Sequence, residues 1–184
     1  MRNFGLSAVL FLCGVSLHLR AIPQNAAPQE QTNFGVEDEF RHPVPLPSTA
    51  LKALQASNDK SDLLAECAED DGLQPSEVPA SWFVASKISL TNNPSSGLVV
   101  RGENQCLAGA HITQFWVLAK SATGEYRIVF RGRGDGMGVL PTRTNGYRDL
   151  QLVIVTQAGA NVDEITFRYS KGSYRISSHH VTHN

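Results

Sequence analysis

The sequence predicts an α+β protein that is mostly β, with one or two short N-terminal helices followed by an antiparallel sheet of about eight strands built from hairpins. Apolar residues follow helical spacing up to the acidic loop at residues 69–72, and beyond it they alternate with polar residues. The connections between the alternating segments are too short for crossover helices, which favours antiparallel pairing. At 184 residues, the chain has the length of a single domain with short flanking segments.

The first residues are typical of an export signal. Arg2 precedes a short apolar run over residues 4–17, which is shorter than the roughly 20 residues of a membrane span. We predict a signal peptide over residues 1–21, with an uncleaved anchor or a lipoprotein at Cys13 as alternatives. No other segment is apolar enough to cross a bilayer, so the expected location is periplasmic or extracellular. The sequence has no Asn-X-Ser/Thr acceptor, which favours a bacterial source.

The three cysteines bear on how the domain is stabilised. Removal of Cys13 with the signal leaves Cys67 and Cys106 as a plausible disulfide in an oxidising compartment. Two alternatives remain open at this point. Both cysteines are unpaired and buried, or Cys106 is a nucleophile with His111 as its base, a role that requires hydrogen-bond contact between the two.

Composition divides the rest of the chain into three parts. Residues 22–47 are rich in proline and glutamine with few large apolar residues, which predicts a disordered linker. Residues 48–178 are expected to form a single β-rich domain, beginning with a helix capped by Ser48 and a second helix from Ser61 to Cys67. The last residues, 179–184, carry three histidines and are expected to be a flexible tail.

The expected strands alternate with turn dipeptides. Turns are predicted at Thr123-Gly124, Asn145-Gly146 and Lys171-Gly172. The expected strands cover residues 82–90, 98–101, 111–120, 126–130, 139–140, 150–156, 165–169 and 174–176. The predicted core consists of Trp82, Val84, Ile88, Phe115, Val117, Ile128, Phe130, Leu152, Ile154, Ile165, Phe167 and Tyr174.

One hairpin carries a short resemblance to a known family. The six residues Asn145-Gly146-Tyr147-Arg148-Asp149-Leu150 resemble the trailing half of FG-GAP or VCBS-type extracellular repeats. In those repeats acidic residues earlier in the loop bind calcium, but this chain has Thr142, Arg143 and Thr144 there, so the resemblance implies no metal site. The mature region as a whole resembles small uncharacterised exported bacterial β-rich domains, which implies a location and no specific activity.

Arginines in the second half of the chain are the candidate ligand-binding residues. Residues 22–80 hold three basic and eleven acidic side chains, whereas residues 81–184 hold eleven basic and six acidic ones. Strict alternation would place Arg127 and Arg131 on one face of a strand, and Arg168 and Arg175 extend that face. Such a ridge suits carboxylate, phosphate or sulfate groups. The alternative is a solvated face that the acidic segment partly neutralises.

Trp116 is a further binding candidate if its indole is exposed beside Arg127, although burial is the usual state of a tryptophan.

These observations favour an exported non-enzymatic binding or inhibitory module of the bacterial envelope. Its expected partner is an envelope protein, a glycan or an anionic small ligand; with a net charge of −1 and no binding motif, nucleic acid is not expected. No catalytic residue, metal or cofactor is assigned. The alternatives are a small extracytoplasmic hydrolase that uses His111 with Asp149 or Asp135, and a structural surface protein without a soluble ligand.

Overall fold

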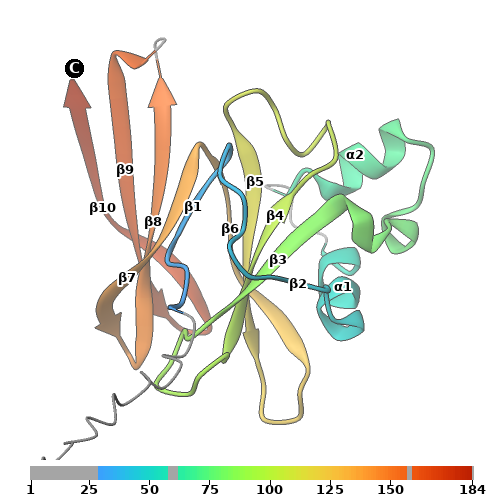
Figure 1. The fold of residues 1–184 in the computed structure, drawn as a ribbon, viewed down its shortest axis with the longest axis horizontal. Coiled ribbons are helices and arrows are strands. Elements are labelled where there is room, and N and C mark those ends of the chain that lie inside the picture. The colour runs from blue at the N-terminus through green and yellow to red at the C-terminus, as the bar shows by residue number, and fades with distance from the viewer. Residues whose placement is uncertain (1–28, 58–61, 157–158, 184) are drawn as a thin grey trace, which may run out of the picture.

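The computed structural model describes residues 29–57, 62–156 and 159–183. The predicted signal peptide, residues 1–21, lies outside these ranges. The described chain is mostly β and antiparallel, as predicted, and Figure 1 shows its arrangement. The predicted single sheet of about eight strands is wrong, because ten strands form two five-stranded sheets. Hydrophobic alternation identifies strands, but it does not say which sheet a strand joins.

We call the two sheets A and B. Sheet A has the order β1-β7-β8-β9-β10, and sheet B has the order β2-β3-β4-β5-β6. The strands of sheet A are β1 (Asn33–Gly35), β7 (Gly136–Thr144), β8 (Tyr147–Thr156), β9 (Asn161–Ser170) and β10 (Ser173–His183). Those of sheet B are β2 (Pro43–Val44), β3 (Phe83–Ile88), β4 (Gly97–Gly102), β5 (Thr113–Lys120) and β6 (Tyr126–Gly134). The helices are α1 (Ser48–Gln55) and α2 (Leu64–Asp70), with single 3₁₀ turns at Pro75–Glu77 and Ala80–Trp82.

Sheet B is the middle of three layers. One core fills the space between the sheets and includes Phe115, Val117 and Phe130. A second core lies between sheet B and the helices and includes Leu54, Leu64 and other side chains of both layers. Every residue of β4 and all but the last residue of β5 are buried, because both faces of sheet B are covered.

Two predicted turns have the geometry that their sequences require. Asn145 and Gly146 have φ values of 51° and 80°, and Lys171 and Gly172 have 49° and 91°. Two consecutive left-handed residues are the mark of a type I′ turn, which matches the twist of the strands it joins. The hairpins β7–β8 and β9–β10 are therefore confirmed.

The segment from residue 29 to residue 47 differs from the predicted disordered linker at 22–47. It contains β1 and β2, and its rings Phe34 and Phe40 are buried, with centroids 5.0 Å apart. The buried guanidinium of Arg101 donates to the carbonyl oxygens of Gly35 at 2.5 Å and Asp38 at 2.7 Å. The composition of the segment did not indicate an ordered structure, because its order depends on two buried aromatic rings and on Arg101, which is distant in the sequence.

The predicted flexible tail at 179–184 is also wrong for residues 179–183. β10 continues to His183, which pairs with Asn161 of β9. Backbone pairing with a long neighbouring strand needs no apolar run, so a polar sequence formed a strand here.

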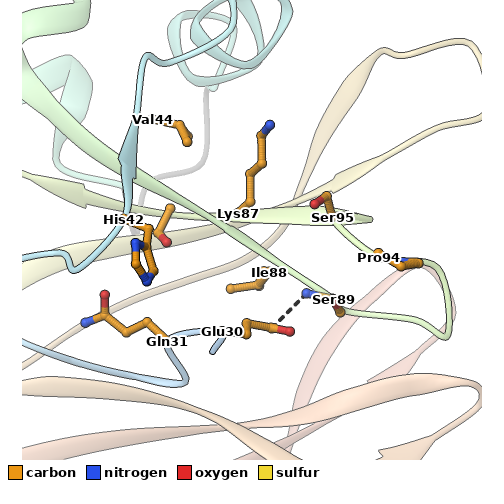
Figure 2. Close-up of a pocket in the computed structure, with 10 residues that line it drawn as sticks. Glu30, Gln31, His42, Val44, Lys87, Ile88, Ser89, Pro94 and Ser95 are labelled. Atoms are coloured by element: carbon orange, nitrogen blue, oxygen red, sulfur yellow. Dashed lines mark hydrogen bonds between the residues drawn. The ribbon is translucent and has the colours of Figure 1, made fainter. Parts of the chain in front are cut away.

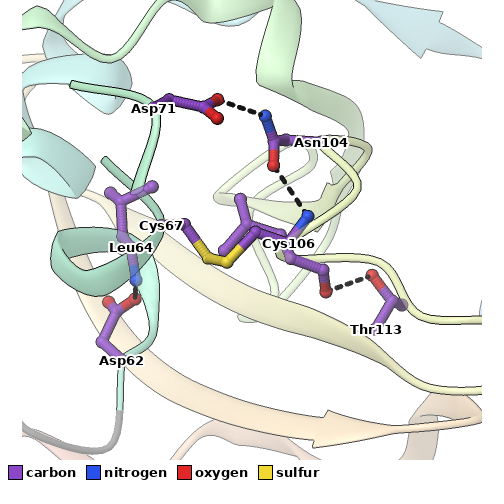
Figure 3. The surroundings of a disulfide bond; sticks show 8 residues. Asp62, Leu64, Cys67, Asp71, Asn104, Cys106 and Thr113 are labelled. Carbon is purple, nitrogen blue, oxygen red and sulfur yellow. Dashed lines mark hydrogen bonds between the residues drawn. A yellow bond between two sulfur atoms is a disulfide. The ribbon is translucent and has the colours of Figure 1, made fainter. Parts of the chain in front are cut away.

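A disulfide bond joins the helical layer to sheet B. Cys67 of α2 is bonded to Cys106 in the loop after β4, with the Cα atoms 5.6 Å apart. Asn104 accepts the backbone N–H of Cys106 at 2.8 Å and donates to Asp71 at 3.1 Å, as Figure 3 shows. The predicted pairing is confirmed, which excludes the free-thiol alternative and the Cys106 nucleophile.

Neither helix of the described ranges is long and apolar enough to cross a membrane.

Candidate functional site

A β-bulge in β6 divides the predicted arginine ridge. Val117 pairs with Phe130 and Leu118 pairs with Ile128, which leaves Val129 as an extra residue. Ile128 packs toward the helical core, whereas Val129 and Phe130 both lie in the core between the sheets. The bulge reverses the alternation, so the contacts of the two β6 arginines lie on opposite faces of sheet B. The expectation of one continuous face was wrong for this strand.

Arg127 connects the β5–β6 hairpin to sheet A. Its guanidinium donates to the hydroxyl of Tyr169 and to the carbonyl oxygen of Gly172. It also lies 6.0 Å from the centre of the Tyr169 ring. The ring of Tyr147 stacks on that of Tyr169 at 3.7 Å, and partial burial, together with a hydrogen bond that Tyr147 donates to Tyr169, raises the pKa of Tyr147. The contacts of Arg127 therefore support the packing of the two sheets.

Arg131 contacts a buried carboxylate on the helical side of sheet B. Its Nε lies 3.6 Å from Oδ2 of Asp62, whose side chain is 2 % exposed. The same oxygen accepts the Oγ–H of Ser57 and the Nε1–H of Trp116, each at 2.8 Å. Oδ1 of Asp62 accepts the backbone N–H of Leu64 at 3.1 Å. We call these five residues the Asp62 cluster.

Trp116 is fully buried, with its ring 5.5 Å from that of Phe83. The binding role of Trp116 required an exposed indole, so it is not supported: the indole lies in the core, the usual state of a tryptophan. Sequence reasoning missed Asp62, although an acidic residue just before a helical run is a recognisable capping signal.

Arg131 and Arg175 come together at a groove between β6 and β10. The groove has a volume of about 320 Å³. Its lining residues are Ile128, Val129, Phe130, Arg131, Phe167, Ser173, Tyr174 and Arg175. A second cavity of about 390 Å³ lies on the α1 side of β6, and Arg127 and Arg131 both line it. Three of the four predicted arginines thus border two cavities along the outer strand of sheet B.

Arg168 and Arg175 form an exposed pair on sheet A. They are directly opposite each other in the β9–β10 register, and both side chains are exposed. Within the described ranges, neither side chain makes a hydrogen bond or an ion pair. Like charges directly opposite one another destabilise a sheet unless a counter-charge lies nearby. We call these two residues the arginine pair.

The groups of the predicted hydrolase are brought together only in part. His111 and Asp135 line one cavity of about 600 Å³ with Val155 and Gly159. His111 Nδ1 is 3.8 Å from Oε1 of Glu37, and both of these side chains are exposed. Oδ2 of Asp135 accepts the backbone N–H of Val155 at 2.8 Å, so this carboxylate caps a strand edge.

Asp149 does not line that cavity. It is buried, and its Oδ1 has no hydrogen-bond partner in the described part of the chain. Burial and, less strongly, the charge of Asp149 raise the pKa of Tyr174. Asp149 is therefore not available to assist His111.

A cavity of about 410 Å³ that the sequence did not indicate lies at the β2–β3 edge of sheet B. Figure 2 shows Glu30, His42 and Lys87 around it. Oε1 of Glu30 accepts the N–H of Ser89 at 2.8 Å and that of the Arg148 Nη1 at 3.2 Å. The mixed signs of charge suit a small polar molecule. Sequence reasoning missed this cavity because Glu30 and His42 fell inside the predicted linker.

Two of the three histidines of β10 lie close to different side chains of β9. His179 Nε2 lies 3.6 Å from Oδ1 of Asp163, and His183 Nδ1 is 2.7 Å from Oδ1 of Asn161. Among the residues the structure describes, no three His, Cys, Asp or Glu side chains are arranged to hold a metal ion.

Comparison with known proteins found no matching family model, no matching curated protein and no matching solved structure. The resemblances to FG-GAP or VCBS-type repeats and to exported β-rich domains therefore stay predictions. Function is inferred from the arrangement of the residues themselves.

Proposed function

We propose that this chain is an exported, non-enzymatic binding or inhibitory module of the bacterial envelope, and that it holds an anionic group at the arginine pair. The observation that carries the proposal is the register of Arg168 and Arg175, two exposed guanidinium groups directly opposite each other. In the described ranges neither has a protein counter-charge within ion-pair distance. A ligand anion would relieve their repulsion.

The chemistry of the pair favours oxyanions. A guanidinium group offers a planar fork of N–H donors that matches carboxylate, phosphate and sulfate. Residues directly opposite in an antiparallel pair have Cβ atoms about 5 Å apart, so one oxyanion can accept from both side chains. Arg168 and Arg175 therefore favour a ligand with at least one such group.

The neighbouring groove indicates what else the ligand carries. Arg175 also lines the groove between β6 and β10, together with the rings of Phe130, Phe167 and Tyr174. Arg175 and Tyr174 are consecutive residues on opposite faces of β10, so an anion attached to an apolar or sugar-like body would place its charge at the arginine pair and extend its body around the edge of β10 toward the groove. An acidic envelope polymer, a glycan or an acidic protein segment meets this description.

The disulfide supports the location. A bond between Cys67 and Cys106 is typical of proteins in an oxidising compartment. A periplasmic or extracellular location is compatible with that bond and with the apolar run at residues 4–17.

Binding to defined anions tests the proposal. The probes are inorganic phosphate, inorganic sulfate, poly-glutamate and a sulfated polysaccharide, each titrated calorimetrically at low salt. The double substitution Arg168→Gln with Arg175→Gln is expected to weaken binding of at least one probe by about tenfold or more. The double substitution Arg41→Gln with Lys52→Gln removes the same charge from exposed positions elsewhere and is expected to leave binding nearly unchanged. Equal losses in the two double variants, or no binding by the unsubstituted chain, would contradict the proposal.

A hydrolase is the second candidate, and the cavity shared by His111 and Asp135 favours it. In that reading His111 activates a water molecule, because the described lining residues offer no hydroxyl or thiol nucleophile. His111→Ala would then abolish turnover of chromogenic ester or glycoside substrates. Unchanged anion binding in the same variant separates this reading from the preferred one.

A further inference from the structure

The end of sheet A projects as a three-stranded arm. We define the arm as residues 153–156 of β8, 161–167 of β9 and 176–183 of β10. Figure 1 shows these strand ends running together toward the C-terminus, away from the helices. The exposed large apolar side chains of the described ranges all lie here: Val155 is 42 % exposed, Ile176 is 66 % exposed and Val181 is 38 % exposed.

The outer strand of the arm has an open edge. β10 is the last strand of sheet A, so one side of its backbone has no neighbouring strand among the described residues. Natural edge strands are usually protected by charged residues, especially lysine, or by proline. Residues 176–183 read Ile-Ser-Ser-His-His-Val-Thr-His and contain none of these beyond the histidines. One bulge after Ile176 is the only protection that the register provides in this described stretch.

We propose that β10 pairs antiparallel with β10 of a second copy of this chain, which joins the two A sheets into one. A two-fold axis at His180 would place residues 177–183 of one copy opposite the same residues of the other. Such an isologous contact closes on itself and forms a dimer rather than a fibre. This inference does not depend on the proposed anion site.

Charge favours a second copy over a foreign strand. An acidic partner would be attracted to Arg168, Lys171 and Arg175, which lie near the β9–β10 turn and outside the aligned segment. The aligned segment itself holds no permanently charged side chain, so two copies meet without fixed repulsion at neutral pH. The charge distribution of this edge is therefore compatible with pairing to a second copy.

The rows across the joined sheet are also compatible with self-pairing. On one face, His180 pairs with Glu164 within the chain and would meet His180 of the second copy. On the other face, Val181 would meet His179 of the second copy. Within each chain, Val181 pairs with Asp163 and His179 pairs with Ile165. The contact therefore covers the exposed Val181. Each histidine at the contact also shares its cross-strand row with a carboxylate, Glu164 for His180 and Asp163 for His179.

Sedimentation at rising concentration is the first test. The unsubstituted full chain is expected to shift from monomer to dimer mass between about 1 μM and about 1 mM, because a single strand pairing buries a small area. His180→Lys would place two ammonium groups at the two-fold axis, and the dimer fraction is expected to fall at least about tenfold. His42→Lys makes the same change at an exposed position outside the arm and is expected to leave the dimer fraction unchanged. A chain that stays monomeric at about 1 mM, or a dimer that His180→Lys does not weaken, overturns the proposal.

Single cysteines provide a second test that does not depend on loss of function. His180→Cys is expected to give the highest yield of disulfide-linked dimer under mild oxidation, because that residue alone faces its own copy. Ser178→Cys and Thr182→Cys are expected to give clearly lower yields. The unsubstituted chain measures links through native cysteines, and His42→Cys measures random collision. Equal yields from these four single-cysteine variants would overturn the antiparallel alignment.

Discussion

Sheet B and the arm of sheet A are built from similar strands but have opposite surroundings. Sheet B is covered by sheet A on one face and by the helices on the other, and β4 is buried at every residue. In the arm, most residues of β8 and β9 are half-buried, and residues 175–183 of β10 are exposed. Most of the buried apolar contact therefore lies on the two faces of sheet B, whereas the outer end of sheet A exposes its edge strand.

The disulfide is the largest single support of the covered region. Replacing Cys67 and Cys106 together by serine is expected to lower the free energy of unfolding by about 4 kcal/mol, given a loop of roughly 40 residues. Urea denaturation of the variant and the unsubstituted chain measures the difference. A loss below about 1 kcal/mol would mean that the helical layer holds sheet B without the bond.

We expect the second largest loss of stability from a change in the Asp62 cluster. Asp62→Ala removes the acceptor of the Trp116 indole and the carboxylate facing Arg131, so a loss of about 3 kcal/mol is expected. The matched control is Asp70→Ala in the exposed part of α2, which is expected to change stability by less than about 0.5 kcal/mol. Urea denaturation measures both variants. Similar losses of unfolding free energy would show that the cluster does not stabilise the fold specifically.

Tyr174 joins the base of sheet A to the core. Its hydroxyl donates to the carbonyl oxygen of Arg148 at 2.6 Å, so Tyr174→Phe is expected to cost about 1 kcal/mol near neutral pH. Burial, chiefly, raises the pKa of Tyr174, so the folded chain keeps this proton where the unfolded chain releases it. This contribution is fully present below about pH 10, the ordinary tyrosine value, and is lost as pH rises above it.

The measurement is the unfolding free energy of both proteins from about pH 8 to about pH 11. The unsubstituted chain is expected to lose stability more steeply than Tyr174→Phe over that range. Tyr126 and Tyr147, whose pKa values are also raised by burial, are present in both proteins and cancel in the difference. Parallel pH curves would show that Tyr174 does not titrate differently in the two states.

A matched isoleucine pair compares the two regions with the same chemical change. Ile88 is fully buried in sheet B, whereas Ile176 is mostly exposed on the arm. Ile88→Val is expected to cost roughly 0.8 kcal/mol, the transfer free energy of one buried methylene, and Ile176→Val almost nothing. Denaturation at low protein concentration measures both. Equal losses of unfolding free energy would contradict the difference in burial between the two regions.

Local chemistry accounts for what the sequence predicted correctly. Glycine and asparagine adopt left-handed conformations readily, so Asn145-Gly146 and the glycine of Lys171-Gly172 marked the two hairpins, although Lys171 is also left-handed. The predicted signal peptide contains Cys13, so two cysteines remained as a predicted pair, and the Cys67–Cys106 bond was predictable for that reason.

Long-range contacts account for what it did not predict. The extra residue Val129 reverses alternation in β6, and the apolar run Ile128-Val129-Phe130 does not by itself show which residue is the extra one. The order of the segment at 29–47 depends on Arg101, which lies far away in the chain. Of the candidate site, Arg168 and Arg175 were predicted to extend the face of Arg127 and Arg131, whereas their position opposite each other and the contact of Trp116 with Asp62 follow from pairing between distant segments.

Amide hydrogen exchange at low micromolar concentration tests the contrast between the regions most directly, because the chain is then monomeric. We expect amides of β5 to exchange only by global unfolding, and those at residues 178–183 of β10 to exchange at least about a hundredfold faster. Comparable protection in β5 and in this part of β10 would contradict it.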